Sequence, residues 1–155
     1  MKRRVARELA IQSLYQIEMN EVSTKEAVEG AIAEAENDNE GELDFSDDKL
    51  SPDYITELVD GIYEYKKQID EMLEEYLKGW QMDRLSRVDR EVLRLAVYEM
   101  VYRDDVPPKV VVNEAIELSK HFGTEESGKF VNGVLGKMIK ELDSLKNKKS
   151  LQNET

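Results

Sequence analysis

Four basic side chains stand within the first seven residues of the chain, namely Lys2, Arg3, Arg4 and Arg7. A helix is predicted from about Arg3 to Met19, so these cations would face the positive end of its dipole, at a cost of roughly a few tenths of a kcal/mol each. A bound phosphate backbone would relieve this arrangement, because cationic side chains and free backbone N–H groups would converge on an anion. The competing interpretation is a frayed, solvated basic terminus.

A second candidate contact is the pair Lys129 and Phe130, near the start of a predicted C-terminal helix. A phenyl ring beside a cation at such a place is a reasonable stacking platform for an unpaired base. On residue type alone, a phenylalanine is more often part of the core. Gly128, Gly133 and Gly136 lie in the same helix, which suggests that another backbone or a ligand approaches closely. Tight helix packing is the interpretation for Gly133 and Gly136.

The sequence contains no recognisable catalytic or metal-binding set. Its single histidine, His121, falls in the last turn of a predicted helix, where a cation suits the dipole. It has no cysteine, no glycine-rich phosphate loop and no HExxH motif. A near-match to a calcium loop between Glu36 and Asp47 has the wrong acids at its ends and lacks flanking EF-hand helices. We therefore expect a protein that is not an enzyme and that needs no metal or cofactor.

Charge is unevenly divided along the chain, whose formal net charge is −12. Residues 1–20 hold four basic and two acidic side chains, residues 21–83 hold five and twenty, and residues 84–155 hold thirteen and twelve. The acidity therefore lies in the middle of the chain. This pattern argues against a non-specific polyanion binder but allows a local anion site.

Length and hydropathy limit the number of domains and the kind of protein that this chain can be. A chain of 155 residues suits one domain, or two small helical subdomains that share a core. The absence of cysteine agrees with a reducing compartment. No apolar run approaches the ~20 residues of a membrane span, and charges interrupt the segment after the basic start, so no signal-peptide core follows. We expect a soluble, cytoplasmic protein with no membrane partner.

Helical periodicity and helix-end signals predict an all-α fold of about six or seven helices in two packed subdomains. Ser86 followed by Asp89 approximates a capping box, and the broad apolar stripe behind it indicates a central helix. Pro108 opens the next helix and Gly123 closes it, although the valine run 110–112 leaves a short strand as the competing assignment. Thr124 is the predicted cap of a last helix that reaches residue 145.

The predicted N-terminal subdomain covers residues 1–80, with an acidic loop at 36–53. It includes a second helix capped by Thr24 and a long helix from Pro52 to Leu77, in which Gly61 marks close packing or a bend. Trp80 and Met82 are expected to cap the core. The C-terminal subdomain covers residues 81–146, and the polar tail 147–155 is expected to be disordered.

Three segments, taken in order, resemble the NusB family of transcription antitermination proteins: KRRVARELAIQSLYQIE, DVPPKVVVNEAIELSKHFG and SGKFVNGVLGKM. The resemblance implies a NusB-like helical bundle that binds the boxA segment of nascent ribosomal RNA. It implies that binding occurs together with NusE, a ribosomal protein of the small subunit. The heterodimer would then join the RNA polymerase elongation complex, with other Nus factors, and suppress termination.

The resemblance also assigns roles to residues of this chain. It implies phosphate contacts by Lys2, Arg3, Arg4 and Arg7, with charge and stacking from Lys129 and Phe130. Tyr15 and Asp89 match family positions that contact NusE, and Glu126 matches an acidic position in the same functional region. Asp89 could equally be only a capping residue.

Two other interpretations remain open. One is a purely protein-binding helical adaptor whose basic end is incidental. The other is a homodimer that hides its RNA face until a partner arrives.

Overall fold

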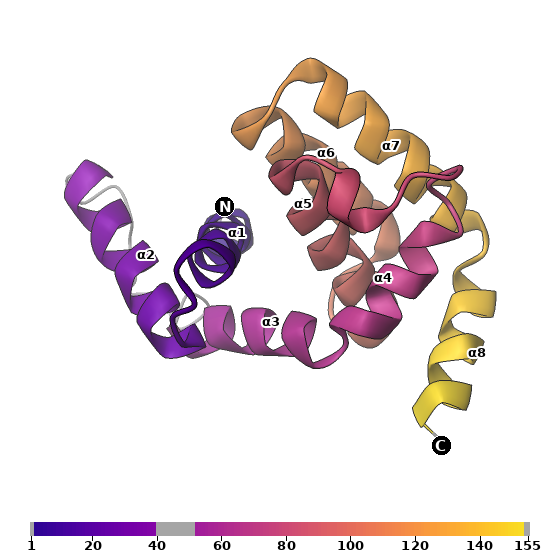
Figure 1. Ribbon diagram of the computed structural model, residues 1–155, viewed down its shortest axis with the longest axis horizontal. Helices are drawn as coiled ribbons and strands as arrows, with labels where there is room; N and C mark the ends of the chain where they lie inside the picture. Colours follow the sequence, from indigo (N-terminus) through magenta and orange to yellow (C-terminus); the bar gives the residue numbers. More distant parts are fainter. Residues whose placement is uncertain (1, 40–51, 154–155) are drawn as a thin grey trace. The chain divides into compact units, whose positions relative to one another are not determined.

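The computed structural model describes residues 2–39 and 52–153, and these fall into two compact units, Met1–Glu64 and Tyr65–Thr155 (Figure 1). Over the described ranges the chain forms eight α-helices and two short helical turns, with no strand, so the all-α prediction is confirmed with slightly more helices than expected. Most of the predicted acidic loop, and with it the calcium-like pattern, lies outside the described residues. No helix in the described part is long and apolar enough to cross a membrane.

The first unit consists of α1 (Lys2–Asn20), α2 (Thr24–Asn39) and α3 (Pro52–Glu64), and each of these helices contacts the other two. One face of α1 is buried and includes Leu9 and Leu14. Its helix ends where Glu21 adopts a left-handed backbone conformation, with φ of 53°. The cap of α2 is Ser23, whose Oγ accepts a hydrogen bond from the Glu26 N–H at 3.2 Å. The cap was predicted one residue later, at Thr24.

The predicted long helix from Pro52 is broken at Tyr65, whose φ of −107° and ψ of 14° are not helical. The helix α4 (Lys66–Glu74) then begins, and it packs on α5 (Arg87–Val97) in the second unit. The unit boundary therefore falls at residue 64 and not near residue 80, because α4 buries its apolar stripe within the second unit. Gly61, where close packing or a bend was predicted, is a buried residue inside α3, so the break in the helix lies elsewhere.

Helix α5 is the centre of the second unit. Its start is capped as predicted, since the Asp89 N–H donates a hydrogen bond to Ser86 Oγ at 3.1 Å. Every residue from 91 to 101 is buried, and α5 contacts α4, α6 (Pro108–Phe122) and α7 (Glu125–Lys140). The last part of this run, η3 (Tyr98–Tyr102), is a π-helical turn. The breadth of the apolar stripe thus predicted correctly that α5 is surrounded.

Helix α6 begins with proline in its first turn, and the valine run belongs to it, so the helical assignment is confirmed over the strand. Thr124 caps α7, accepting a hydrogen bond from the Ser127 N–H at 3.3 Å. These two helices make the most extensive helix–helix contact of the second unit.

The C-terminal segment differs from the prediction. The last helix stops at Glu141, and α8 (Leu142–Asn153) continues through most of the stretch that was expected to be disordered. Leu145 anchors α8, with 1% of its surface exposed. Lys146 pairs with Asp104 at 3.3 Å and Lys148 with Glu75 at 2.8 Å. These contacts explain why so polar a segment is held in place.

A charged cluster lies inside the second unit. The Arg94 guanidinium donates two hydrogen bonds to Asp70, at 2.8 and 2.9 Å, and a third to Glu91 at 2.7 Å. Arg94 and Glu91 are both nearly inaccessible to solvent. Burial lowers the pKa of Arg94, but its hydrogen bonds and charge interactions with Asp70 and Glu91 more than compensate, and the net shift is upward. This cluster ties α4 to α5.

Replacing the buried cation tests how strongly the second unit depends on that cluster. Arg94→Ala should lower the free energy of unfolding by on the order of 3 kcal/mol, since it leaves a buried carboxylate without its main partner. Lys148→Ala removes an ion pair of equal length on the surface and should cost about 1 kcal/mol or less. Urea unfolding followed by circular dichroism measures both, and equal losses would contradict the importance given to burial.

Candidate nucleic-acid interface

The basic start of the chain forms the first two turns of α1, and the first turn contains no acidic residue. The unfavourable placement of cations at the positive end of the helix is therefore present in the structure. Arg3 and Arg4 are partly exposed, and the Arg3 guanidinium carbon lies 5.8 Å from the centre of the Tyr54 ring. This cation–π contact fixes Arg3 near the tip of α1. The side chain of Lys2 lies outside the described residues.

Arg7 differs from the other predicted phosphate contacts. Only 2% of its surface is exposed, which leaves its guanidinium out of reach of a phosphate group in this structure. Its position on the helix explains the difference, because Arg7 occupies the buried face with Ala6 and Ala10. This burial is an observation against a direct phosphate contact by Arg7, which stays a prediction.

In the second unit, Lys129 and Phe130 lie together in the first half of α7, with Glu126 one turn earlier. Lys129 is exposed and its ammonium is 3.6 Å from the Glu126 carboxylate, which is also exposed. A pair so open to water holds Lys129 weakly and leaves it able to exchange Glu126 for another anion. Phe130 is only partly buried, so it is not a core residue.

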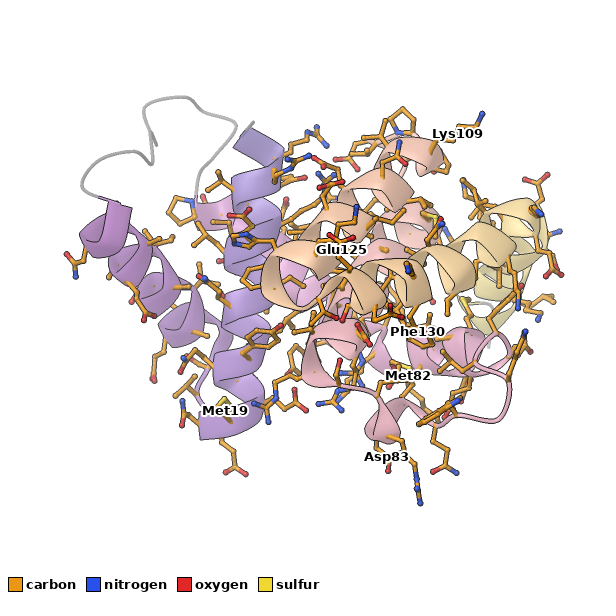
Figure 2. The ribbon with its side chains drawn as sticks, turned by 90° about the horizontal axis from the view of Figure 1, so that it is seen from above. Met19, Met82, Asp83, Lys109, Glu125 and Phe130 are labelled. Carbon is orange, nitrogen blue, oxygen red and sulfur yellow. The ribbon has the colours of Figure 1, made fainter. Side chains whose placement is uncertain are left out.

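Phe130 borders a groove that the sequence did not predict. The groove has a volume of about 240 Å³ and lies between α7 and the segment that follows α4. We call it the Trp80 groove, and its lining residues are Tyr76, Leu77, Lys78, Trp80, Lys129, Phe130, Gly133, Val134 and Lys137. Figure 2 shows Phe130 on the side of α7 that faces the connector carrying Met82 and Asp83.

Trp80 was expected to cap the core together with Met82, and only Met82 does so. Met82 is 5% exposed, whereas Trp80 is 57% exposed. Lys78 and Gly79 both have left-handed backbone conformations, with φ of 50° and 91°, and this turn carries Trp80 out of the apolar interior. The Trp80 N–H donates to the carbonyl of Leu77 at 3.1 Å, which closes the turn.

Close packing was predicted at Gly133 and Gly136, but the structure has it at Gly128 instead. A methyl group at Gly133 or Gly136 would meet nothing within 4 Å, whereas at Gly128 it would lie 3.0 Å from Cγ of Lys120. The close approach is therefore between Gly128 and a side chain of α6. Gly133 instead is one of the residues that line the Trp80 groove, and it carries no side chain into it.

The three residues expected to contact a protein partner have different surroundings. Tyr15 is partly exposed on α1, and Glu126 is exposed on α7. Asp89 is half-buried at the start of α5. Burial raises the pKa of its carboxyl, while hydrogen bonds with Ser127 and Ser86 act in the opposite direction. Asp89 thus combines a capping position with a carboxylate that is only partly solvated.

The described residues contain no group of three or more potential metal ligands. His121 is exposed and makes an edge-on ring contact with Phe122, at 4.8 Å between centroids. It lies in the last turn of α6, as predicted.

Comparison with known proteins gives a consistent result. The family model for the NusB family matches residues 4–140. Similar curated proteins include the transcription antitermination protein NusB of Bacillus velezensis, 43% identical over 93% of this chain and 100% of its own length. The NusB of Myxococcus xanthus is 44% identical over 91% of this chain and 96% of its own.

Solved structures with the same fold include NusB from T. maritima, with a TM-score of 0.75 and 37% identity over 91% of this chain and 92% of that one. Another is a crystal structure of antitermination factors NusB and NusE in complex with double-stranded RNA. Its matching chain has a TM-score of 0.75 and 29% identity, over 90% of this chain and 96% of that one.

Alanine substitutions at the three glycines of α7 test how much space lies beside each of them. Gly133→Ala and Gly136→Ala should each raise the free energy of unfolding by up to about 1 kcal/mol, because alanine favours the helix and the added methyl meets no neighbour. Gly128→Ala should gain less or lose stability, since Lys120 must move aside. Urea unfolding compares the three, and an equal gain at all of them would contradict the close contact at Gly128.

Proposed function

This chain belongs to the NusB family, and on that premise we propose that it is an RNA-binding transcription antitermination factor that acts with NusE on the boxA segment of nascent ribosomal RNA. The family is one of antitermination factors and not of enzymes. The observation that carries the proposal is the concentration of cations in the first turns of α1, in a chain whose net charge is −12. An anionic ligand is the simplest reason for that arrangement.

The proposed RNA contacts come from both units. Lys2, Arg3 and Arg4 would neutralise phosphates, while Lys129 would add charge and Phe130 would stack on an unpaired base. Arg7, which is buried, would support α1 from within and not touch RNA directly. About four cations would then give log K a slope near −3 against log salt, at roughly 0.7 per phosphate for a single strand.

The proposed protein partner is NusE, through Tyr15, Asp89 and Glu126. A relative of similar fold has been solved as a complex of NusB, NusE and RNA, which supports this choice. The heterodimer would join the RNA polymerase elongation complex with other Nus factors, in the cytoplasm. A homodimer that covers the RNA face before NusE arrives is the alternative assembly, and sedimentation of the protein alone would detect it.

A protein-binding adaptor without RNA contact is the second candidate, favoured by the strongly negative net charge and by the burial of Arg7. Electrophoretic mobility shift with boxA RNA separates the two functions. The antitermination proposal predicts weak binding by the protein alone and tighter binding with NusE. No shift in the presence of NusE would favour the adaptor.

The phosphate contacts of α1 can be tested without disturbing the core. Arg3→Ala combined with Arg4→Ala should abolish most boxA binding and reduce the salt slope by about 1.4, while helical circular dichroism is retained. Lys25→Ala removes an exposed cation elsewhere in the first unit and should leave affinity nearly unchanged. Unchanged affinity in the double variant would retire the phosphate assignment for α1.

Asp89 can be tested for a role beyond capping. Because burial raises its pKa above 3.8, the folded state holds the proton more tightly, and stability is lost as pH rises through the folded pKa. Asp89→Asn removes that loss and retains the hydrogen-bonding shape, so it should be at least as stable as wild type at pH 7. If the carboxylate contacts NusE, the same variant should weaken NusE binding in isothermal titration calorimetry. Unaltered NusE affinity would leave Asp89 with its capping role alone.

A further inference from the structure

We propose that the Trp80 groove is a second RNA-contact site, in which Trp80 stacks on a base while Lys78 and Lys137 hold a phosphate next to it. The inference rests on the proposed function and extends it along the strand from Phe130. None of these three residues was predicted from the sequence to touch RNA. All of them line one groove within the second unit.

The first argument is the exposure of Trp80. Tryptophan is the largest apolar side chain, and it normally buries most of its surface. Here more than half of it faces solvent, although Met82, two residues later, is packed into the core. The left-handed turn at Lys78 and Gly79 holds Trp80 in this position, so its exposure is built into the backbone. An indole face held open beside a phenyl ring is suited to stacking with bases.

The second argument is the charge of the groove. Its lining residues include three lysines and no carboxylate, in a chain with 34 acidic and 22 basic residues. Lys129 and Lys137 stand two turns apart on α7, with Gly133 between them on the same face. Lys78 approaches from the other wall. A locally cationic groove on an acidic protein favours an anionic ligand.

The third argument is the closeness of Lys78 and Lys137. Side-chain contact with Lys78 is the main cause that lowers the pKa of Lys137, although Lys137 lies at the surface. Two ammonium groups that approach each other repel, and an anion placed between them would turn this repulsion into two attractions. A phosphate of a nucleotide strand would supply that anion, while the adjacent base lies over Trp80.

The mixture of groups favours single-stranded RNA over a protein partner. Aromatic faces interleaved with cations are the common design of single-strand sites, because every base has a stackable face and every linkage a negative charge. Gly133 lines the groove without a side chain, and no atom lies within 4 Å of where its Cβ would be, which leaves room for a flat group to enter. An acidic peptide would satisfy the lysines but would give Trp80 and Phe130 no flat partner.

The chain supplies its own reporter, since Trp80 is its only tryptophan. The experiment is a titration of the full-length protein, preassembled with a tryptophan-free variant of NusE, with a boxA RNA oligonucleotide while intrinsic fluorescence is recorded. Stacking on Trp80 should quench the emission in step with the bound fraction measured by mobility shift. Full binding without a change in emission would overturn the inference and leave the proposed function intact.

Variants test the groove independently of the reporter. Trp80→Leu should weaken RNA binding roughly 5- to 140-fold, the range that stacking of one base spans, and Trp80→Phe should restore most of the affinity. Lys78→Ala with Lys137→Ala should reduce the salt slope by about 1.4. Lys109→Ala is the matched control, since this exposed lysine lies on α6 away from the groove (Figure 2). Thermal melts of all variants establish that they fold.

The outcomes separate the two proposals. Phe130→Leu and the Arg3, Arg4 double variant report on the proposed function. If these weaken binding while the Trp80 and lysine variants bind as wild type does, the groove is not an RNA site. If acidic peptide but not RNA competes for the groove, the inference is equally overturned. If wild type with NusE binds no RNA at all, the proposed function itself fails.

Discussion

The second unit depends on the burial of one continuous run, which covers most of α5 and of the turn η3 that follows it. Eleven consecutive residues, 91–101, are inaccessible, and no regular amphipathic surface helix has such a pattern. Burial on every side forces each charge in the run to find a partner, which Arg94 does with Asp70 and Glu91. The same constraint places α4 against α5 within the second unit and leaves α6 and α7 to cover other sides of α5. The groove that α7 forms with the segment after α4 follows from that packing.

Local chemistry accounts for what the sequence predicted well. Ser86 and Thr124 cap their helices because the donor and acceptor lie three residues apart, a relation visible in the sequence. The helical period of residues 86–138 predicted the central and C-terminal helices, and it outweighed the strand propensity of three valines. The family resemblance was carried by the same segments and by the basic α1.

The structure differs from the sequence predictions where contacts between residues far apart in the chain determine the local conformation. The break at Tyr65 has no glycine or proline to announce it, and it exists because the residues after it pack in a different unit. Arg7 is buried and Trp80 is exposed. Residue type alone predicts the opposite for both side chains. For the Trp80 groove, the sequence held one weak indication: Lys129 and Lys137 lie four residues before and after Gly133, on one face of the helix. Only the turn at Gly79 brings Trp80 to that face.

The lysine-rich stretch near the C-terminus forms the helix α8, and its lysines contact other parts of the second unit. Lys146 and Lys148 are engaged with carboxylates of the same unit, and Lys149 contacts the Val101 carbonyl and the Tyr102 ring. The segment 147–155 was predicted to be disordered, yet the lysines of this stretch attach the last helix to its own unit. Dissolved ions screen ion pairs of this kind, so rising salt should loosen the attachment of the last helix to its own unit.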